Sequence, residues 1–469
     1  MSYESYRKLK IEGYYDHQLQ SLLSSYNPNK PTVILLPGGM GSQLERTEYP
    51  VGREPNVIND VIWVDWGIFW PKRDARNLKI EVGRSEERDK DSHVVAAHGP
   101  LKFITQTPYQ ELGDHAYNEG WNYFVFGFDW RRPLSESATY FRDFIYKFQK
   151  EILAVHRKDP IPNLTVVCHS MGGLVCTYAL ADRSFSNLGF RGIVTIATPF
   201  YGTSTQQDRY FRGDEDLLNK IYGKADVIDI TASLPGPYTL MFLPKETYKR
   251  DGRRLGLSRY PEYDPADNSD TDPYDPSMMS RWPQPVKDHK QFLSRARTEL
   301  IRVAQPLQSN IASVYFNVRS SLDANTAVEL LWAKDPATKP SPIAGIPGPG
   351  DGTVPAWAAW HAYTRPANRC ELKQAKDHGL LLEHVEVLSV IDSIVKTRKL
   401  PTIKKRAARS PSVTNAKAVD RTIDSWVKKS KSKQAPPKEL FEKPLQRAIL
   451  SSLIAGKKPR MVRRRPKEP

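Results

Sequence analysis

The residues best suited to chemistry surround Ser170, in the segment 166–175, which reads VVCHSMGGLV. A β-branched run leads directly into the serine, and a helical pattern begins directly after it. This order is typical of a nucleophile elbow, a sharp turn that needs small residues two positions away on either side. Gly172 meets that need, and Cys168 is a small residue where the pattern usually has glycine. The alternative is a serine that only caps a helix, but Gly172 and Gly173 would weaken an ordinary first turn.

A nucleophilic serine needs a base to take its proton and a carboxylate to orient that base. In chains with a nucleophile elbow, the carboxylate follows the serine and the histidine comes last. Asp351 lies in the Gly/Pro-rich segment 346–355, where an aspartate could equally be a turn residue. His378 precedes the last helical pattern, and His384 lies within it. We expect His378 to be the base, because a residue at the edge of a loop, rather than within a helix, can come within hydrogen-bond reach of Ser170.

The tetrahedral intermediate of acyl transfer needs two backbone N–H groups that stabilise its oxyanion. Met171, the residue after the serine, supplies one of them. We expect Gly39, in the glycine-rich loop 37–41 after an apolar run, to supply the other. This loop also partly fits the G-x-G-x-x-G dinucleotide fingerprint, but Leu44 stands in place of the third glycine. We expect the mechanism to need neither a metal nor an organic cofactor.

Aromatic residues between positions 63 and 70 are candidates for contact with an apolar substrate. Trp63 and Trp66 are candidates for substrate contact, together with Met40 in the glycine-rich loop. The interpretation that we favour for these tryptophans is that they are aromatic residues of the core.

The elements that must position these residues alternate between short apolar runs and longer amphipathic stretches. The runs typical of buried parallel strands are 32–36, 123–128, 164–168, 192–197 and 313–318. Helical periodicity is clearest in 139–156, 171–183 and 380–396. This alternation predicts an α/β fold with a mostly parallel central sheet flanked by helices.

The pattern divides the chain into a body, 1–399, and a tail. Within the body the alternation breaks down over about 201–293, which we interpret as a cap or lid insertion. Its acidic stretch 261–285 lacks EF-hand spacing, so we expect a polar surface insertion rather than a calcium loop. The tail, 400–469, is rich in Lys, Ser and Pro and predicts a flexible, largely disordered segment. Within it, 439–455 has the spacing of an amphipathic helix.

Charge separates the same two parts. Of the net charge of +16, the tail accounts for +15, with 20 Lys and Arg against 5 Asp and Glu. The nearly neutral body has no electrostatic attraction for nucleic acid, and we expect no nucleic-acid partner. Basic clusters beside an apolar helical face favour peripheral contact of the tail with an anionic membrane. A solvated tail, or a helix docked on the body, is the alternative.

Cysteine content and hydropathy indicate the compartment. Three cysteines are too few for a disulfide framework, and no apolar leader or membrane-spanning run is present in the sequence. We expect a cytoplasmic protein.

Taken in order along the chain, the motifs resemble those of the lecithin:cholesterol acyltransferase-like proteins, within the α/β-hydrolases. The segments that carry the resemblance are 37–45 (PGGMGSQLE), 128–131 (FDWR), 169–173 (HSMGG), 198–202 (TPFYG) and 350–355 (GDGTVP). The resemblance implies the α/β-hydrolase fold and acyl transfer from a lipid ester to water or an alcohol. It also implies that Ser170, Asp351 and His378 correspond to the catalytic triad.

The sequence departs from that family at several points. Phe128 replaces a tyrosine, Cys168 replaces a glycine, and no paired cysteines are available for the disulfide-tethered lid of secreted members. Two other functions therefore stay open at this point. One is an esterase acting on small soluble esters, and the other is a non-catalytic protein that binds membranes or nucleic acid through its basic tail.

Overall fold

The computed structural model describes residues 2–47, 60–63, 75–82, 87–89, 93–101, 107–212, 224–265, 267–332, 342–375 and 377–401. Trp66 and residues 402–469 of the predicted tail, including its amphipathic segment, lie outside the described residues.

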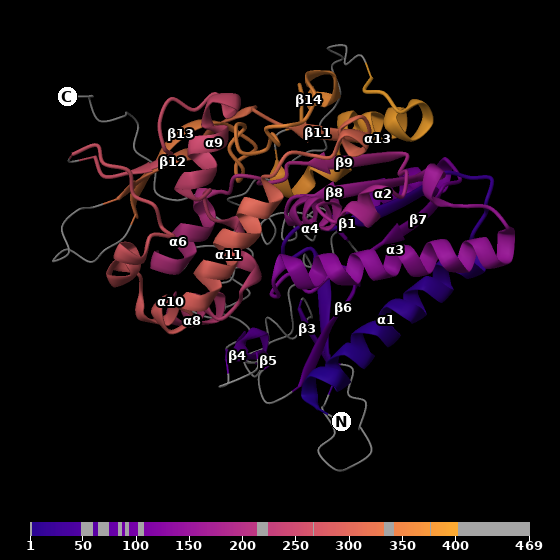
Figure 1. Ribbon diagram of the computed structural model, residues 1–469, viewed down its shortest axis with the longest axis horizontal. Helices are drawn as coiled ribbons and strands as arrows, with labels where there is room; N and C mark the ends of the chain where they lie inside the picture. Colours follow the sequence, from indigo (N-terminus) through magenta and orange to yellow (C-terminus); the bar gives the residue numbers. More distant parts are fainter. Residues whose placement is uncertain are drawn as a thin grey trace, which may run out of the picture.

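A six-stranded sheet in the order β14-β11-β9-β8-β1-β7 forms the centre of the fold, and each neighbouring pair in it is parallel (Figure 1). The strands are β1 (Thr32–Leu36), β7 (Asn122–Val125), β8 (Leu164–His169), β9 (Gly192–Ile196), β11 (Tyr315–Arg319) and β14 (Arg369–Glu371). Strands β1, β8 and β9 are buried along their whole length, which is why their sequences are apolar on both faces. The predicted α/β fold with a mostly parallel sheet is confirmed.

Helices cover both faces of this sheet. On one face, Ile34 and Leu36 of β1 join a core with side chains of α3 (Leu134–His156) and α4 (Met171–Leu180). On the other face, Val33 and Leu35 pack in a second core that contains side chains of α2 (Gln110–Asn118) and α13 (Val385–Thr397). Alternate side chains of one strand therefore belong to two different cores, as the pleat of a strand requires.

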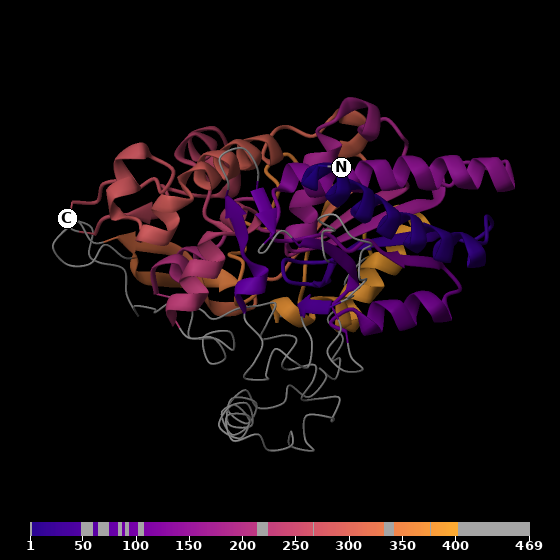
Figure 2. The ribbon, with the colours of Figure 1, turned by 90° about the horizontal axis from the view of Figure 1, so that it is seen from below.

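Helix α1 (Tyr3–Ser25) lies beside α3, as two views of the ribbon show (Figures 1 and 2). Its buried side chains are mostly tyrosines and leucines, and the ring of Tyr15 stacks on Phe126 with 4.8 Å between the ring centroids. No helix is predicted here from the sequence, because more than half of its buried positions carry tyrosine or arginine rather than aliphatic side chains.

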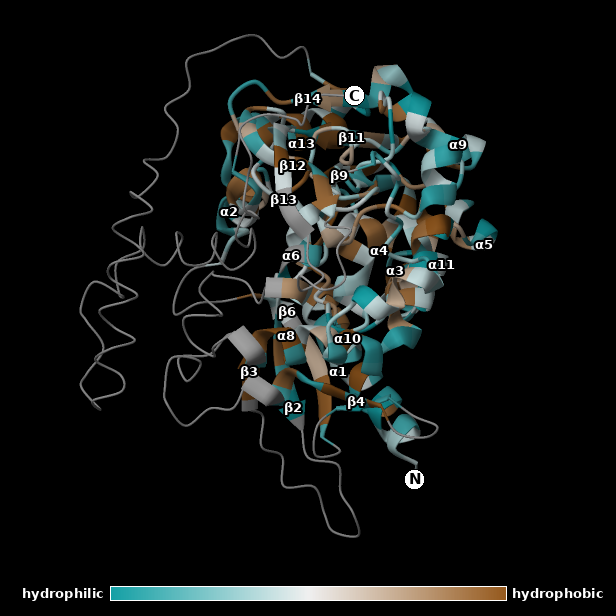
Figure 3. Cartoon of the chain, turned by 90° about the vertical axis from the view of Figure 1, so that its left-hand side faces the viewer, coloured by the Kyte–Doolittle hydropathy of each residue, from teal (hydrophilic) through white to brown (hydrophobic). Residues whose placement is uncertain are grey.

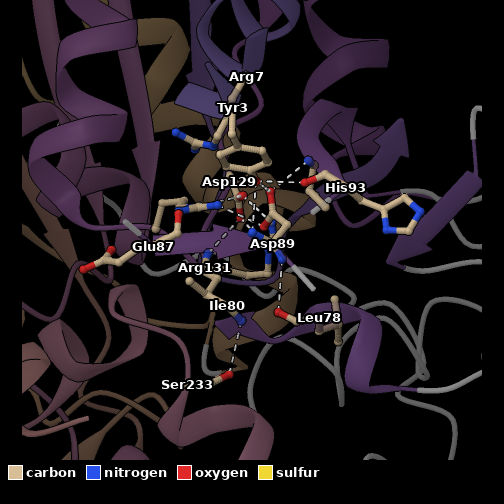
Figure 4. Close-up of polar contacts among 12 residues, drawn as sticks. Tyr3, Arg7, Leu78, Ile80, Glu87, Asp89, His93, Asp129, Arg131 and Ser233 are labelled. Carbon is tan, nitrogen blue, oxygen red and sulfur yellow. Dashed lines mark hydrogen bonds and ion pairs between the residues drawn. The ribbon is translucent and has the colours of Figure 1, made fainter. Parts of the chain in front are cut away.

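A buried cluster of charges connects α1 to the loop that follows β7 (Figure 4). The Arg131 guanidinium donates to Asp129 (2.7 Å), to Asp89 (2.9 Å) and to the carbonyl oxygen of Leu78 (3.0 Å). The Tyr3 hydroxyl accepts a hydrogen bond from the Asp89 amide (2.9 Å). Burial opposes ionisation of the Asp89 carboxyl, but three neighbouring guanidinium groups outweigh it and hold its pKa below the usual value. The cluster therefore fixes the backbone that carries Leu78.

Antiparallel strands extend the fold beyond the glycine-rich loop. Strand β2 (Ser42–Thr47) pairs with both β3 (Asp60–Trp63) and β6 (Val94–Pro100), and β4 (Ile80–Val82) pairs with β5 (Glu87–Asp89). The 3-10 helix η2 (Ala75–Leu78) precedes β4.

The described part of the segment predicted as a cap, 201–293, consists mainly of short helices. They are α6 (Ser204–Arg212), α8 (Lys224–Ala232), η5 (Gly236–Leu240), α9 (Lys245–Leu255), η6 (Pro276–Arg281) and α10 (Gln284–Asp288), followed by α11 (Lys290–Val303). All of them except α9 contribute to a core of their own, which includes Tyr238, Trp282 and Phe292. Leu255 of α9 packs in the main core instead. A small sheet of β10 (Glu262–Tyr263), β12 (Asp323–Trp332) and β13 (Pro342–Gly350) lies beside them, although β12 and β13 come later than the predicted segment.

The acidic stretch 261–285 uses its carboxylates for local structure. Asp272 accepts hydrogen bonds from the amides of Lys245 and Tyr274, at 3.1 and 3.0 Å. Asp275 caps η6, and Asp270 forms an ion pair with Lys245 at 2.9 Å. These carboxylates thus serve local structure, but Glu262 and Asp264 are buried, so the stretch lies only partly at the surface.

The distribution of hydropathy follows this architecture. Figure 3 shows hydrophilic colour on outer helices such as α9 and α5 (Arg183–Ser186) and hydrophobic colour on α4, which packs against the sheet. Among the described residues, the helices that are long enough to cross a bilayer are too polar to do so.

Candidate active site

The turn at Ser170 has the strained geometry that the sequence predicts. Ser170 lies between β8 and α4 with φ 50° and ψ −123°, and its amide donates to the Ile196 carbonyl oxygen at 2.9 Å. A Cβ atom on Gly172 would lie 2.3 Å from the Pro37 carbonyl oxygen, and one on Gly173 would lie 1.9 Å from Thr198 Oγ1. Glycine is therefore required at both positions, because α4 begins directly against the end of β1 and the loop after β9.

Three predicted residues, far apart in the sequence, come together at this turn. His378 Nε2 lies 3.0 Å from Ser170 Oγ, and His378 Nδ1 lies 2.7 Å from Asp351 Oδ2. All three side chains are at most 8% exposed. With the proton of the neutral imidazole on Nδ1, that nitrogen donates to Asp351, and Nε2 accepts from the serine hydroxyl. This is the arrangement that lets an imidazole take a proton from a serine.

Backbone groups hold the acid and the base in place. The second oxygen of Asp351 accepts the amides of Thr353 (3.0 Å) and Val354 (2.7 Å). The His378 amide donates to the Asp351 carbonyl oxygen at 3.2 Å. His384, the alternative base, lies apart from the serine, since its Nδ1 accepts the Glu386 amide and caps α13. The helix predicted over 380–396 therefore begins at Val385, after a 3-10 turn, η8 (His378–Glu383).

The glycine-rich loop passes directly over the serine. The Gly41 amide donates to the Gly38 carbonyl oxygen (3.0 Å), and the Gly38 amide donates to the Tyr109 hydroxyl (2.9 Å). A Cβ on Gly39 would lie 3.4 Å from Met171 Sδ, and both residues line the same cavity as Ser170. The loop leads into strand β2 rather than into a helix, so the dinucleotide interpretation is wrong for this loop.

A largely apolar cavity of about 80 Å³ opens beside Ser170 and His378. Trp63 and Met40, two of the candidates for substrate contact, line it. Trp63 is also fully buried, with its indole N–H on the Met40 carbonyl oxygen at 2.9 Å, so it belongs to the core as well. Lining residues that the sequence analysis did not identify include Leu78, Trp130, Gln206, Arg209, Ile230 and Leu240.

One cluster of metal-type ligands occurs among the described residues, away from this cavity, at His115, Glu119 and Asp392. The Lys396 ammonium group lies 2.9 Å from a Glu119 oxygen and 2.7 Å from an Asp392 oxygen. The Lys396 ammonium group therefore already pairs with both carboxylates and offsets one of their two negative charges.

Comparison with known proteins agrees with the fold. Residues 97–327 match the protein family described as alpha/beta hydrolase fold. The solved structure of the Tle4-Tli4 complex has a chain that superposes with a TM-score of 0.51 at 14% identity, over 79% of this chain and 99% of that one. The chain therefore has the alpha/beta-hydrolase fold.

Two curated proteins are more specific relatives. Lecithin-cholesterol acyltransferase-like 4 of Arabidopsis thaliana is 24% identical over an alignment of 244 positions, which covers 46% of this chain and 44% of that protein. Triacylglycerol lipase 2 of Saccharomyces cerevisiae is 35% identical over 57 residues, which are 12% of this chain and 18% of the lipase. The matches thus span less than half the length of either relative. The chain is a distant homologue of the acyltransferase-like protein, in agreement with the resemblance of its motifs.

Proposed function

We propose that the protein is a serine hydrolase or O-acyltransferase that acts on lipid esters, of the lipase, phospholipase or acyltransferase type. The observation that carries the proposal is the hydrogen-bonded chain Ser170–His378–Asp351 at the edge of a largely apolar cavity. Both curated relatives have names that refer to lipid esters or to acyl transfer from them.

In the proposed reaction, Ser170 Oγ attacks the acyl carbonyl carbon while His378 Nε2 takes the hydroxyl proton. The amides of Gly39 and Met171 donate to the oxyanion of the tetrahedral intermediate. Collapse of that intermediate breaks the ester bond, and the imidazolium of His378 protonates the departing alcohol. Asp351 keeps the imidazole in the required tautomer throughout.

The acyl-enzyme is resolved by the same groups in reverse. His378 takes a proton from water or from an acceptor alcohol, whose oxygen attacks the acyl carbon and releases Ser170. Water yields a fatty acid, and an alcohol yields a new ester. No step in this sequence requires a metal or an organic cofactor.

Replacement of the nucleophile tests this proposal. Ser170→Ala should leave the free energy of unfolding nearly unchanged and lower the turnover of a short acyl ester by on the order of 10⁴-fold or more. Products from a labelled phospholipid, with and without an added alcohol, then distinguish hydrolysis from transfer. Wild-type turnover in the alanine variant would exclude the serine mechanism.

The small volume of the cavity, about 80 Å³, favours a second candidate, an esterase acting on small soluble esters. Such an enzyme would hydrolyse monomeric short-chain esters and gain nothing when the substrate aggregates. A lipid-ester enzyme should become more active above the aggregation point of its substrate. Rates measured across that point with one ester series therefore separate the two candidates.

We also propose that segment 201–293 is a cap over the catalytic body and that the basic tail brings the enzyme to anionic membranes. Each basic residue near such a surface contributes about 1 kcal/mol. Full-length protein should sediment with anionic vesicles and not with neutral ones, and a chain ending at Lys399 should stay in solution. Equal sedimentation of both chains would remove the tail from the mechanism.

A further inference from the structure

His169, the last residue of β8, is a buried histidine that the proposed mechanism does not use. Its Nε2 lies 3.0 Å from the carbonyl oxygen of His378. The two imidazole rings are 5.0 Å apart between centroids, and the ring of Tyr109 contacts His169 edge-on at 6.1 Å. His169 thus lies between the nucleophile turn and the segment that carries the base.

The protonation of His169 follows from these surroundings. Burial, and next the charge of the nearby His378, lower the pKa of His169 to about 3, so its ring is neutral near pH 7. A neutral imidazole carries one N–H, and the carbonyl acceptor requires that it be on Nε2. Among the described residues, Nδ1 has no hydrogen-bond partner. The single N–H of the His169 imidazole therefore donates to the backbone carbonyl oxygen of His378.

This contact completes a set of three that holds the base. The carboxylate of Asp351 binds the imidazole of His378, and the backbone carbonyl of Asp351 accepts the His378 amide. The His378 carbonyl oxygen accepts the third hydrogen bond, from His169, which is adjacent to Ser170 in the chain. This hydrogen bond connects the residue before the nucleophile directly to the backbone of the base.

We propose that His169 is a positioning residue, which holds His378 at reacting distance from Ser170 by donating to the His378 carbonyl oxygen. The inference rests on the proposed function, since it concerns the same serine and base. Displacement of a reacting group by about 1 Å can lower the rate on the order of 10²-fold. Loss of the link should therefore lower kcat and leave KM unchanged, because His169 is not among the residues that line the substrate cavity.

A matched pair of variants tests this role. His169→Gln keeps an N–H donor near the position of Nε2, whereas His169→Leu keeps the bulk and removes the donor. With a short acyl ester, the leucine variant should lose on the order of 10²-fold in kcat at unchanged KM, and the glutamine variant should retain most of the kcat. If the leucine variant fails to fold, His169→Asn replaces it, since its amide is too short to reach the same carbonyl.

A second measurement distinguishes failure of the positioning role from failure of the proposed function. The labelling rate of Ser170 with a fluorophosphonate is measured in the wild type and in each variant. If the wild type is labelled and the leucine or asparagine variant reacts equally fast, the positioning role is wrong and the serine mechanism stands. Equal losses in the glutamine and leucine variants, or a change confined to KM, would also overturn the positioning role. If Ser170 of the wild type is not labelled, the proposed function itself is wrong.

Discussion

Replacement of Gly172 by alanine should disrupt the junction between β1 and α4. The added Cβ would lie 2.3 Å from the Pro37 carbonyl oxygen and 2.5 Å from that of Leu36. Both atoms are backbone, so neither can rotate away. Ordinary van der Waals contact begins near 3.4 Å, so the helix must shift by about 1 Å from the loop that carries Gly39.

Two opposing contributions determine the change in the free energy of unfolding. Overpacking of a dense core lowers it by about 1–3 kcal/mol, and we expect the upper end because the added Cβ would clash with backbone atoms, which cannot move aside. Alanine in a helix returns about 1 kcal/mol relative to glycine. The free energy of unfolding should therefore fall by about 2 kcal/mol. Because the shift moves Ser170 and Met171 away from Gly39, kcat for a short ester should also fall, on the order of 10²-fold.

Urea unfolding and steady-state kinetics measure the two effects of Gly172→Ala. Gly113→Ala, within helix α2, is the matched control, since its Cβ would lie at an ordinary 3.5 Å from the Tyr123 ring. It should leave kcat unchanged and raise stability by up to about 1 kcal/mol. If Gly172→Ala behaved like this control, the close approach of α4 to the end of β1 would be refuted.

Three further predictions follow from the contacts at the site. His378→Gln should lower kcat on the order of 10⁴-fold. His384→Gln should leave kcat unchanged and lower the free energy of unfolding by about 1 kcal/mol, because it weakens the cap of α13. The reverse result in the same assays would assign the base to His384. Tyr109→Phe leaves the Gly38 amide without its acceptor, so urea unfolding should show a loss of about 1–3 kcal/mol, and an unchanged unfolding curve would contradict that contact. Burial lowers the pKa of His361 to about 4, so the unfolded chain binds a proton there below pH 6.5 that the folded chain does not. Stability should decline as pH falls from about 6.5 to about 4, by up to about 1.4 kcal/mol per pH unit from this group, and a pH profile equal to that of His361→Phe would contradict this account.

The central sheet could be predicted because its strands are buried on both faces and therefore read as continuous apolar runs. The run 32–36 coincides with β1, and 164–168 differs from β8 by a single residue. Ser170 could be proposed as the nucleophile because a serine on a tight turn requires small residues beside it. Its partners could be proposed from their order along the chain. Gly172 shows the constraint physically, because a carbonyl oxygen occupies the space that a side chain would need.

Elements that depend on pairing with distant residues could not be predicted. Segment 342–350, PIAGIPGPG, has the composition of a loop, yet it forms strand β13 because β12 supplies its hydrogen bonds. It lies at the edge of its sheet, where proline is tolerated. Helix α1 packs against α3 and β6 through a stripe in which tyrosines and an arginine outnumber aliphatic residues, so its sequence signal is weak. The contact of His169 with His378 spans 209 positions of sequence, and no local pattern indicates it.

The most direct test of the proposed function is the site and stoichiometry of reaction with a fluorophosphonate. Full-length protein should bind one equivalent of the probe, and peptide mass spectrometry should locate it on Ser170. Labelling should be lost in Ser170→Ala and greatly slowed in His378→Gln, since only an activated serine reacts. Absence of labelling in the folded wild type, or labelling that persists in Ser170→Ala, would contradict a serine nucleophile at this site.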